Sequence, residues 1–167
     1  MGEYQLIEDA FYRSYDPSVL EHLLADENRL GRLEKVGEGF CFRAYRLSGT
    51  QMPIVLHIAK REFFREKRDD IKEWRSAMDV VRKLRAPLIP PMELLILEDK
   101  VAYAMPFCPK TVPESSLTDQ VRDFYQALDS HKLDLGDCLQ VRGLGNLAFQ
   151  IDWSDLGFSS AKNGRFR

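Results

Sequence analysis

Cysteine is scarce in this 167-residue chain, and long apolar runs, sequence repeats and a strong net charge are missing. The three cysteines, Cys41, Cys108 and Cys138, are scattered and odd in number, which argues against a disulfide framework. No run approaches the roughly 20 apolar residues of a membrane helix, and no secretory signal opens the chain. The sequence therefore predicts a cytoplasmic protein with no membrane association.

The charge balance gives no reason to expect a nucleic-acid partner. The 24 Lys and Arg residues are offset by 26 Asp and Glu residues. Basic residues are dense between Lys60 and Arg85, but acidic residues interleave with them, which indicates a salt-bridged helix face. The cysteines and histidines show no metal-ligand spacing. The sequence therefore predicts neither nucleic-acid binding nor a zinc-type site.

The length and the 44% hydrophobic content predict one soluble domain with its own core. Asp16-Pro17 predicts a helix start, and that helix is expected to end near Gly31. Beyond it the sequence predicts a strand-turn-strand unit over 33–47, a turn at 48–50, a strand over 53–59 and a helix over 69–85. A hairpin of 92–97 and 101–105, turning at 98–100, is expected next, followed by a break at 106–109. The remaining expected elements are a helix opened by a capping box at 116–119, a strand over 138–141, a turn at 143–146 and a strand ending at Asp152.

A glycine turn, Val36-Gly37-Glu38-Gly39, lies within the first strand pair. Glycine lets backbone N–H groups approach phosphate oxygens without a Cβ in the way, although such a turn is also common in plain hairpins. Lys60 ends the apolar strand that follows. A lysine there either binds phosphate or extends its amine to water.

A buried lysine needs a carboxylate partner, and the next helix offers one. Glu73 flanks the apolar stripe of that helix and is the first choice, with Glu66 and Asp79 as alternatives. Acidic residues on such a helix are also commonly solvated.

The segment from His131 to Val141 resembles a shortened H-x-D-L-x-x-x-N catalytic loop with its following strand. Ile151-Asp152-Trp153 resembles the I-D-W segment of aminoglycoside-phosphotransferase-like and other small kinases. With the glycine turn and Lys60 before them, these pieces are similar in order to the protein-kinase-like superfamily over residues 33–158. The resemblance implies an α+β fold: an N-lobe of antiparallel sheet and one helix, and a minimal C-lobe of one helix and a β-hairpin.

On this resemblance a single kinase-like domain has four parts: an N-terminal helical extension over 1–32, an N-lobe over 33–105, a hinge over 106–110 and a reduced C-lobe over 111–167. The resemblance also implies ATP and Mg²⁺ as cofactors. The implied catalytic residues are Asp134, as the catalytic base, together with Lys60 and Glu73. The residues implied to bind the nucleotide are Gly37, Gly39, Lys60 and Met105. Those implied to bind the metal are Asp152 and Asp137.

A second register stays open. Asp137 and Asp155 are 18 residues apart, as are Asp134 and Asp152, and Asp155-Leu156-Gly157 is similar to the D-F-G of protein kinases. The first register is preferred because Asp152 directly ends an apolar strand. Aspartates are also common turn and cap residues around a hairpin.

The sequence departs from the family at several points. Phe42 replaces the third loop glycine, the catalytic loop has no arginine, and the chain ends 15 residues after Asp152, before any substrate platform. The leading hypothesis is a minimal ATP/Mg²⁺-dependent kinase-like protein that phosphorylates itself, at Ser159, Ser160 or N-terminal tyrosines, or a partner. The alternative is an inactive pseudokinase that binds a nucleotide or a protein. In either case a second copy or a protein partner is expected to cover the truncated lobe.

Overall fold

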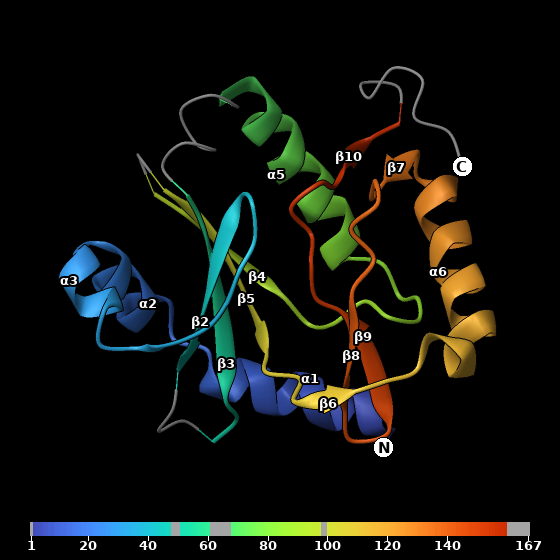
Figure 1. The fold of residues 1–167 in the computed structure, drawn as a ribbon, viewed down its shortest axis with the longest axis horizontal. Coiled ribbons are helices and arrows are strands. Elements are labelled where there is room, and N and C mark those ends of the chain that lie inside the picture. Colours follow the sequence, from blue (N-terminus) through green and yellow to red (C-terminus); the bar gives the residue numbers. More distant parts are fainter. Residues whose placement is uncertain (1, 48–50, 61–67, 98–99, 160–167) are drawn as a thin grey trace. The chain divides into compact units, whose positions relative to one another are not determined.

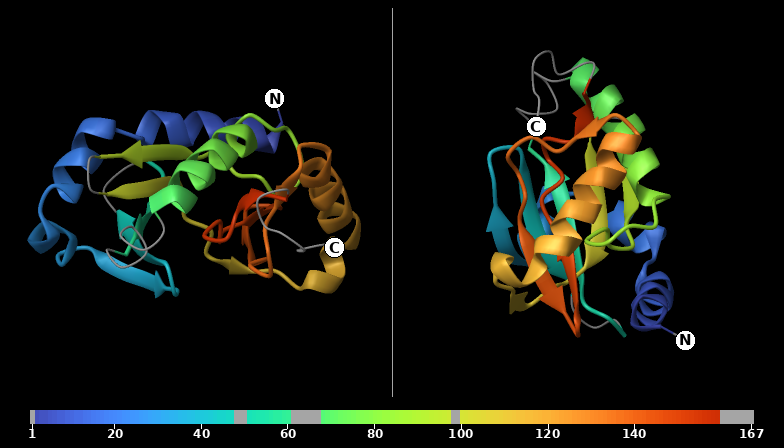
Figure 2. Two further views of the ribbon diagram at one scale, coloured as in Figure 1. Left: turned by 90° about the horizontal axis from the view of Figure 1, so that it is seen from above. Right: turned by 90° about the vertical axis from the view of Figure 1, so that its right-hand side faces the viewer.

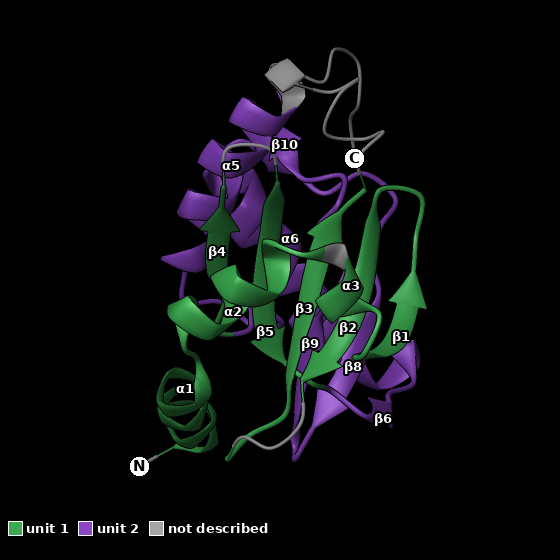
Figure 3. Cartoon of the chain, turned by 90° about the vertical axis from the view of Figure 1, so that its left-hand side faces the viewer, with its two compact units in different colours: residues 1–67, 91–107 green, residues 68–90, 108–167 purple. Residues whose placement is uncertain are grey.

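The computed structural model describes residues 2–47, 51–60, 68–97 and 100–159. The chain divides into two compact units (Figure 3): unit 1 comprises residues 1–67 and 91–107, and unit 2 comprises residues 68–90 and 108–167. Within the described ranges, no helix is both long enough and apolar enough to cross a membrane.

Unit 1 contains a five-stranded antiparallel sheet. In chain order its strands are β1 (Glu34–Glu38), β2 (Phe42–Leu47), β3 (Ile54–Ala59), β4 (Glu93–Ile96) and β5 (Val101–Pro106). Their order across the sheet is β1-β2-β3-β5-β4 (Figure 3). The glycine turn and the strand before Lys60 are therefore neighbours, since β2 lies between β1 and β3.

Three helices precede this sheet: α1 (Glu3–Ser14), α2 (Pro17–Leu24) and α3 (Glu27–Leu30). The carboxylate of Asp16 accepts the Ser18 N–H, so the predicted helix start at Asp16-Pro17 is confirmed. The predicted single helix to Gly31 is instead divided into α2 and α3. Helices α1 and α2 pack on β5 and β4 (Figure 2).

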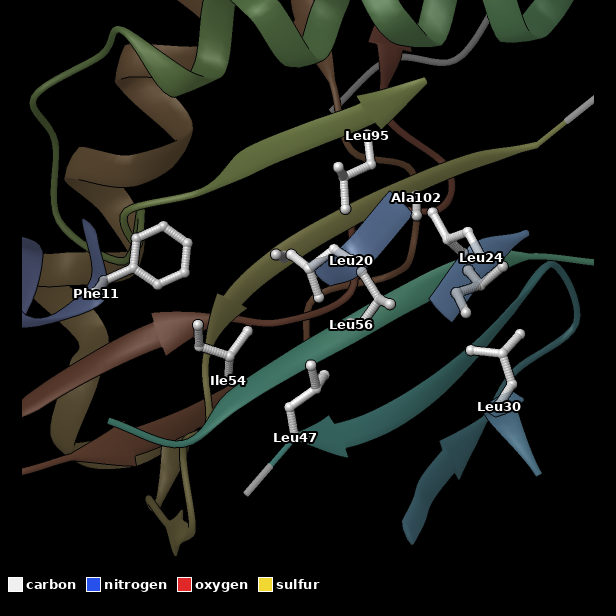
Figure 4. Close-up of a cluster of buried hydrophobic side chains, with 11 residues drawn as sticks. Phe11, Leu20, Leu24, Leu30, Leu47, Ile54, Leu56, Leu95 and Ala102 are labelled. Atoms are coloured by element: carbon white, nitrogen blue, oxygen red, sulfur yellow. The ribbon is translucent and has the colours of Figure 1, made fainter. Parts of the chain in front are cut away.

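The core of unit 1 lies where these helices meet the sheet (Figure 4). Ile54, Leu56 and Ile58 alternate along β3 and point to the same face, as the two-residue period of a strand requires. Leu20 and Leu24 from α2 pack against this face. Each fully buried aliphatic side chain of this kind contributes about 1.5–3 kcal/mol.

Unit 2 combines two long helices with short strands. The helices are α5 (Arg68–Arg82) and α6 (Thr118–Ser130), the latter preceded by the 3₁₀ turn η1 (Glu114–Leu117). The strands form a three-stranded antiparallel sheet and a separate pair: β6 (Lys110–Thr111), β8 (Val141–Leu144) and β9 (Leu147–Gln150) in the order β6-β8-β9, and β7 (Leu133–Asp134) with β10 (Gly157–Phe158).

Trp153 is the centre of the unit 2 core and is fully buried. Its ring meets the Phe124 ring of α6 edge-on, with centroids 5.9 Å apart. Its backbone oxygen accepts the indole N–H of Trp74 on α5 at 2.8 Å, and its own indole N–H donates to the Gln150 carbonyl. Both helices therefore hold the segment that follows β9.

The α+β class and the antiparallel sheet pairing are confirmed, and the strands over 33–59, the helix near 69–85 and the hairpin over 92–105 are present. The strand predicted at 138–141 lies instead at Val141–Leu144, and the chain turns at Gly145, whose φ of 61° suits glycine. The capping box is wrong: Leu117 precedes α6, and Ser116 Oγ donates to the Pro113 carbonyl. The predicted turn at 48–50 and residues 98–99 lie outside the described residues.

The two units divide the chain differently from the predicted lobes. Residues 68–90, which include α5, belong to unit 2, whereas the sequence grouped them with the strands of residues 33–105. The chain passes from unit 1 to unit 2 between Phe107 and Cys108, inside the range predicted as a hinge.

Candidate functional site

Of the predicted glycine turn, only Gly39 lies between β1 and β2, because Val36, Gly37 and Glu38 belong to β1. The Gly39 N–H donates to the Phe42 carbonyl at 2.9 Å, which closes the turn. The Lys60 N–H donates to the Cys41 carbonyl at 2.7 Å, so the residue after β3 is tied to the same turn. Phe40 at the tip is 99% exposed. Hydrogen bonds therefore hold the turn and Lys60 next to each other.

Packing does not require glycine at Gly37 or Gly39. A Cβ on Gly37 would meet only the Ala44 Cβ at 3.8 Å, and one on Gly39 only the Phe42 oxygen at 3.9 Å, both ordinary contacts. Neither has the positive φ that favours glycine. By contrast, a Cβ on Gly143 of β8 would lie 2.8 Å from Val112 Cγ2. Open backbone at Gly37 and Gly39 is what a ligand approaching the hairpin needs.

The Lys60 amine pairs with a carboxylate of this hairpin. Its Nζ lies 2.9 Å from Glu38 Oε2, and Lys35 Nζ lies 2.6 Å from Glu38 Oε1. Hydrogen bonds from Lys35 and then Lys60, together with their positive charges, lower the pKa of Glu38 from 4.5 to about 2. Glu38 is therefore ionised at any physiological pH.

Met105, implied as a nucleotide-binding residue, is on β5 opposite Val55 of β3. Its side chain is only 1% exposed. The side chain therefore serves the core, which leaves its backbone as the part able to meet a ligand.

Glu73 of α5, predicted as the partner of Lys60, binds a backbone group of unit 2. Its carboxylate accepts the Phe158 N–H of β10 at 2.7 Å. The alternative Asp79 pairs with Arg82 on the same helix at 3.1 Å, and the alternative Glu66 lies outside the described residues. Glu73 thus anchors the strand that follows Asp155.

Asp134 is part of β7 and is buried, with 2% of its surface exposed. Its Oδ1 accepts the Gly136 N–H at 2.9 Å, and Gly136 has a φ of 69°. This arrangement is an Asx turn, in which the carboxylate shapes its own loop. A buried carboxylate engaged in this way is poorly placed to receive a proton from a substrate.

Asp152 also shapes its own segment. Its Oδ1 accepts the Ser154 N–H at 3.0 Å and the Ser154 hydroxyl at 2.6 Å. Its Oδ2 lies 3.4 Å from the Gln140 side-chain nitrogen. Asp152 is therefore part of the contact between its segment and the loop after β7.

Asp137 and Asp155 lie on two segments that run antiparallel (Figure 1). Asp134 pairs with Gly157 at one end, and the Ile151 N–H donates to the Gln140 carbonyl at the other. Between these contacts both segments turn, since Gly136 has a φ of 69° and the Leu156 N–H donates to the Trp153 carbonyl. Cys138 Sγ lies 3.9 Å from Ser154 Oγ, so the two segments also meet through side chains. The fold therefore holds side by side the two segments that carry the four aspartates.

Gln150 holds this arrangement together and was missed by the sequence reasoning. It is fully buried on β9. Its Oε1 accepts the Gln140 N–H at 2.7 Å, and its Nε2 donates to the carbonyls of Cys138 and Asp152. The only sequence signal is one polar residue inside the apolar run Leu147-Ala-Phe-Gln-Ile151. Gln150 therefore fixes the backbone of both segments that carry the aspartates.

A hollow of about 520 Å³ opens beside Asp137 and is lined by Tyr125, Asp129, Gly136, Asp137 and Leu139, all of unit 2. Among the residues that the structure describes, no three His, Cys, Asp or Glu side chains are grouped to hold a metal ion by themselves. Magnesium commonly uses one or two carboxylates together with substrate phosphates. A carboxylate pair suits that mode of binding.

The buried thiol of this unit is unsuited to nucleophilic chemistry. Burial raises the pKa of Cys108 from 9.0 to about 12, despite the nearby Arg142 charge. The Arg142 guanidinium donates to the carbonyls of Cys108 and Pro109 at 2.9 and 2.7 Å. These residues therefore serve the structure of the segment that enters unit 2.

Comparison with protein-family models gave no match to this chain, and comparison with curated proteins gave no similar sequence.

Proposed function

We propose that this chain is a kinase-like protein that binds ATP with Mg²⁺ and transfers its γ-phosphoryl group to a hydroxyl of its own or of a partner. In protein kinases a glycine-rich loop covers the phosphates and the phosphate-binding lysine belongs to the third strand. Unit 1 has the same sequence of parts, with Gly37 near the end of β1, Gly39 between β1 and β2, and Lys60 directly after β3. Gly37, Gly39 and Lys60 are the proposed phosphate-binding groups.

The engagement of the Asp134 and Asp152 carboxylates in their own turns carries the proposal. It supports the register in which Asp155-Leu156-Gly157 corresponds to D-F-G. In that register Asp155 is the proposed magnesium ligand, and Asp137, at the edge of the hollow, accepts the proton of the acceptor hydroxyl. The burial of Asp134 supports the same choice. Mg²⁺ would neutralise the charge that develops on the phosphate oxygens.

A second candidate is a pseudokinase that binds nucleotide without transfer. The pairing of Lys60 with Glu38 favours it, because a lysine held by a carboxylate of the hairpin must exchange partners before it meets a phosphate. The two candidates share nucleotide binding and differ only in transfer.

The test combines thermal shift with γ-labelled ATP in the presence of Mg²⁺. The wild type and Asp119→Asn, a change at an 83%-exposed carboxylate on α6, are expected to be stabilised and to carry label. Asp137→Asn is expected to be stabilised but to lose at least about 100-fold in labelling rate, and Lys60→Met to lose the stabilisation. Stabilisation without label in the wild type would select the pseudokinase. Absence of any nucleotide-dependent shift would refute both candidates.

A further inference from the structure

Four charged side chains meet on the glycine hairpin, and three of them are cations. Lys35 is on β1, Arg43 is directly opposite Glu38 on β2, and Lys60 follows β3. The distances from Glu38 are 2.6 Å to Lys35, 3.8 Å to Arg43 and 2.9 Å to Lys60. Among the described residues, one carboxylate thus faces three positive charges, which leaves an excess of two.

The local backbone creates this cluster. In a regular strand Lys35 and Glu38 would point to opposite faces, because side chains alternate. The pairing of β1 with β2 shifts register between Lys35 and Gly37. Such a bulge adds one residue and brings both side chains to the same face. The bulge therefore places Lys35 beside Arg43 and Lys60 as the third cation of the cluster.

The cluster fits an anion with more oxygens and more charge than a carboxylate. The two oxygens of Glu38 already divide between the lysines, Oε1 to Lys35 and Oε2 to Lys60. A phosphate group offers an additional oxygen and a second negative charge, which would balance the excess. Side-chain exposures of 52% for Lys35 and 48% for Arg43 leave the cluster open to solvent.

We propose that Lys35, Arg43 and Lys60 form a polyphosphate-binding site, and that Glu38 is a built-in competitor which occupies this site until a phosphate displaces it. Lys35 and Arg43 then become phosphate-binding residues in addition to Lys60. The inference deepens the proposed function, on which it rests only for the identity of the ligand as a nucleotide. Because Glu38 stays ionised down to about pH 2, ligand competition rather than protonation releases the cations.

The experiment measures binding of inorganic pyrophosphate by calorimetry, without Mg²⁺ and at low ionic strength. Glu38→Gln is expected to bind about three- to tenfold more tightly than the wild type, the range given by one or two solvent-exposed ion pairs. Glu34→Gln is the matched control, since it removes a carboxylate from the same strand that pairs with Arg46 at 3.9 Å. Its affinity is expected to stay within about twofold of the wild type.

Two further variants keep the test decisive. Glu38→Asp retains the charge on a shorter side chain and is expected to fall between wild type and Glu38→Gln. Adding Lys35→Gln to Glu38→Gln is expected to remove the gain, with circular dichroism showing whether each variant is folded. Equal affinities for Glu38→Gln and Glu34→Gln, or no pyrophosphate binding by Glu38→Gln, would overturn the inference.

Parallel titrations with ATP and Mg²⁺ separate this inference from the proposed function. Tighter pyrophosphate binding by Glu38→Gln without nucleotide binding by any variant would refute the nucleotide function and support the anion site. Nucleotide binding that is equal in wild type and Glu38→Gln would support the function and refute the role of Glu38.

Discussion

The two units hold their candidate groups by different means. In unit 1, the Glu38 carboxylate forms an ion pair with the Lys60 amine, and 38% of the Glu38 side chain is exposed. In unit 2, the segments that carry Asp137 and Asp155 are fixed by the fully buried Gln150 and by Trp153. An exposed ion pair exchanges partners at little cost, whereas a buried network resists change.

Under the proposed function, this difference suits the two units to separate tasks. Groups that exchange partners suit a ligand that arrives and leaves, as the phosphates of a nucleotide do. A backbone that Gln150 fixes before the ligand binds suits the proposed metal-binding and proton-accepting segments. Substitution of Gln150 should therefore affect folding, and substitutions in the unit 1 hairpin should affect binding.

The largest effect is expected from Gln150→Leu. The change leaves the Gln140 N–H and the carbonyls of Cys138 and Asp152 without their partner. At about 1–3 kcal/mol for each unsatisfied buried group, the three groups should lower the free energy of unfolding by at least about 3 kcal/mol. Urea unfolding measures it. Gln140→Leu, at an exposed side chain of the same loop, should cost less than about 0.5 kcal/mol. Similar losses for the two would contradict the role given to Gln150.

Acid should weaken unit 1 through His57. Burial lowers the pKa of this histidine from 6.5 to about 3, its Nδ1 has no hydrogen-bond partner among the described residues, and its ring stacks on Tyr103 at 4.3 Å. The unfolded chain therefore binds a proton that the folded chain does not, and stability present above pH 6.5 is lost as the pH falls toward 3.

Between pH 6.5 and pH 4 this loss should be about 3 kcal/mol, and His57→Phe, which keeps a ring on Tyr103, should remove it. Urea unfolding of both proteins at the two pH values measures the difference. Equal pH dependence in wild type and variant would show that His57 is accessible to protons in the folded sheet.

Paired glycine substitutions should give a smaller effect that separates packing from binding. Gly143→Ala forces a Cβ to within 2.8 Å of Val112 Cγ2 and should cost about 1–2 kcal/mol. Gly37→Ala meets only Ala44 at 3.8 Å and should change stability by less than about 0.5 kcal/mol. Thermal unfolding measures both, and nucleotide titration should show weaker binding for Gly37→Ala alone. A destabilised Gly37→Ala would mean that the hairpin needs this glycine for its own fold.

Local patterns in the sequence were sufficient to predict most of the sheet of unit 1, the start of α2, and α5. Alternating apolar residues along β3, the Asp16-Pro17 helix start and the apolar stripe of α5 are local signals, and each corresponds to an element in the structure. The short pairs β7 and β10 were not predicted, because two-residue strands have no period of their own and depend on long-range pairing.

The candidate site was predictable in its residue types and not in its register. Two aspartate pairs have the same spacing along the chain, so sequence distance could not choose between them. The proposed choice rests on the turns that engage the Asp134 and Asp152 carboxylates, which depend on the folded chain. The ion pair between Lys60 and Glu38 could not be predicted either, because the bulge that brings Lys35 beside Glu38 has no signal in the sequence.

Calorimetric titration of ATP with and without Mg²⁺ tests the central proposal, the register that uses Asp137 and Asp155, most directly. The account predicts that Asp155→Asn loses the Mg²⁺-dependent part of the affinity, at least about tenfold, as expected when a charged metal ligand is removed. Asp152→Asn keeps an oxygen able to accept from Ser154 and should stay within about threefold of the wild type. An equal or larger loss in Asp152→Asn, with Mg²⁺ dependence intact in Asp155→Asn, would contradict the account.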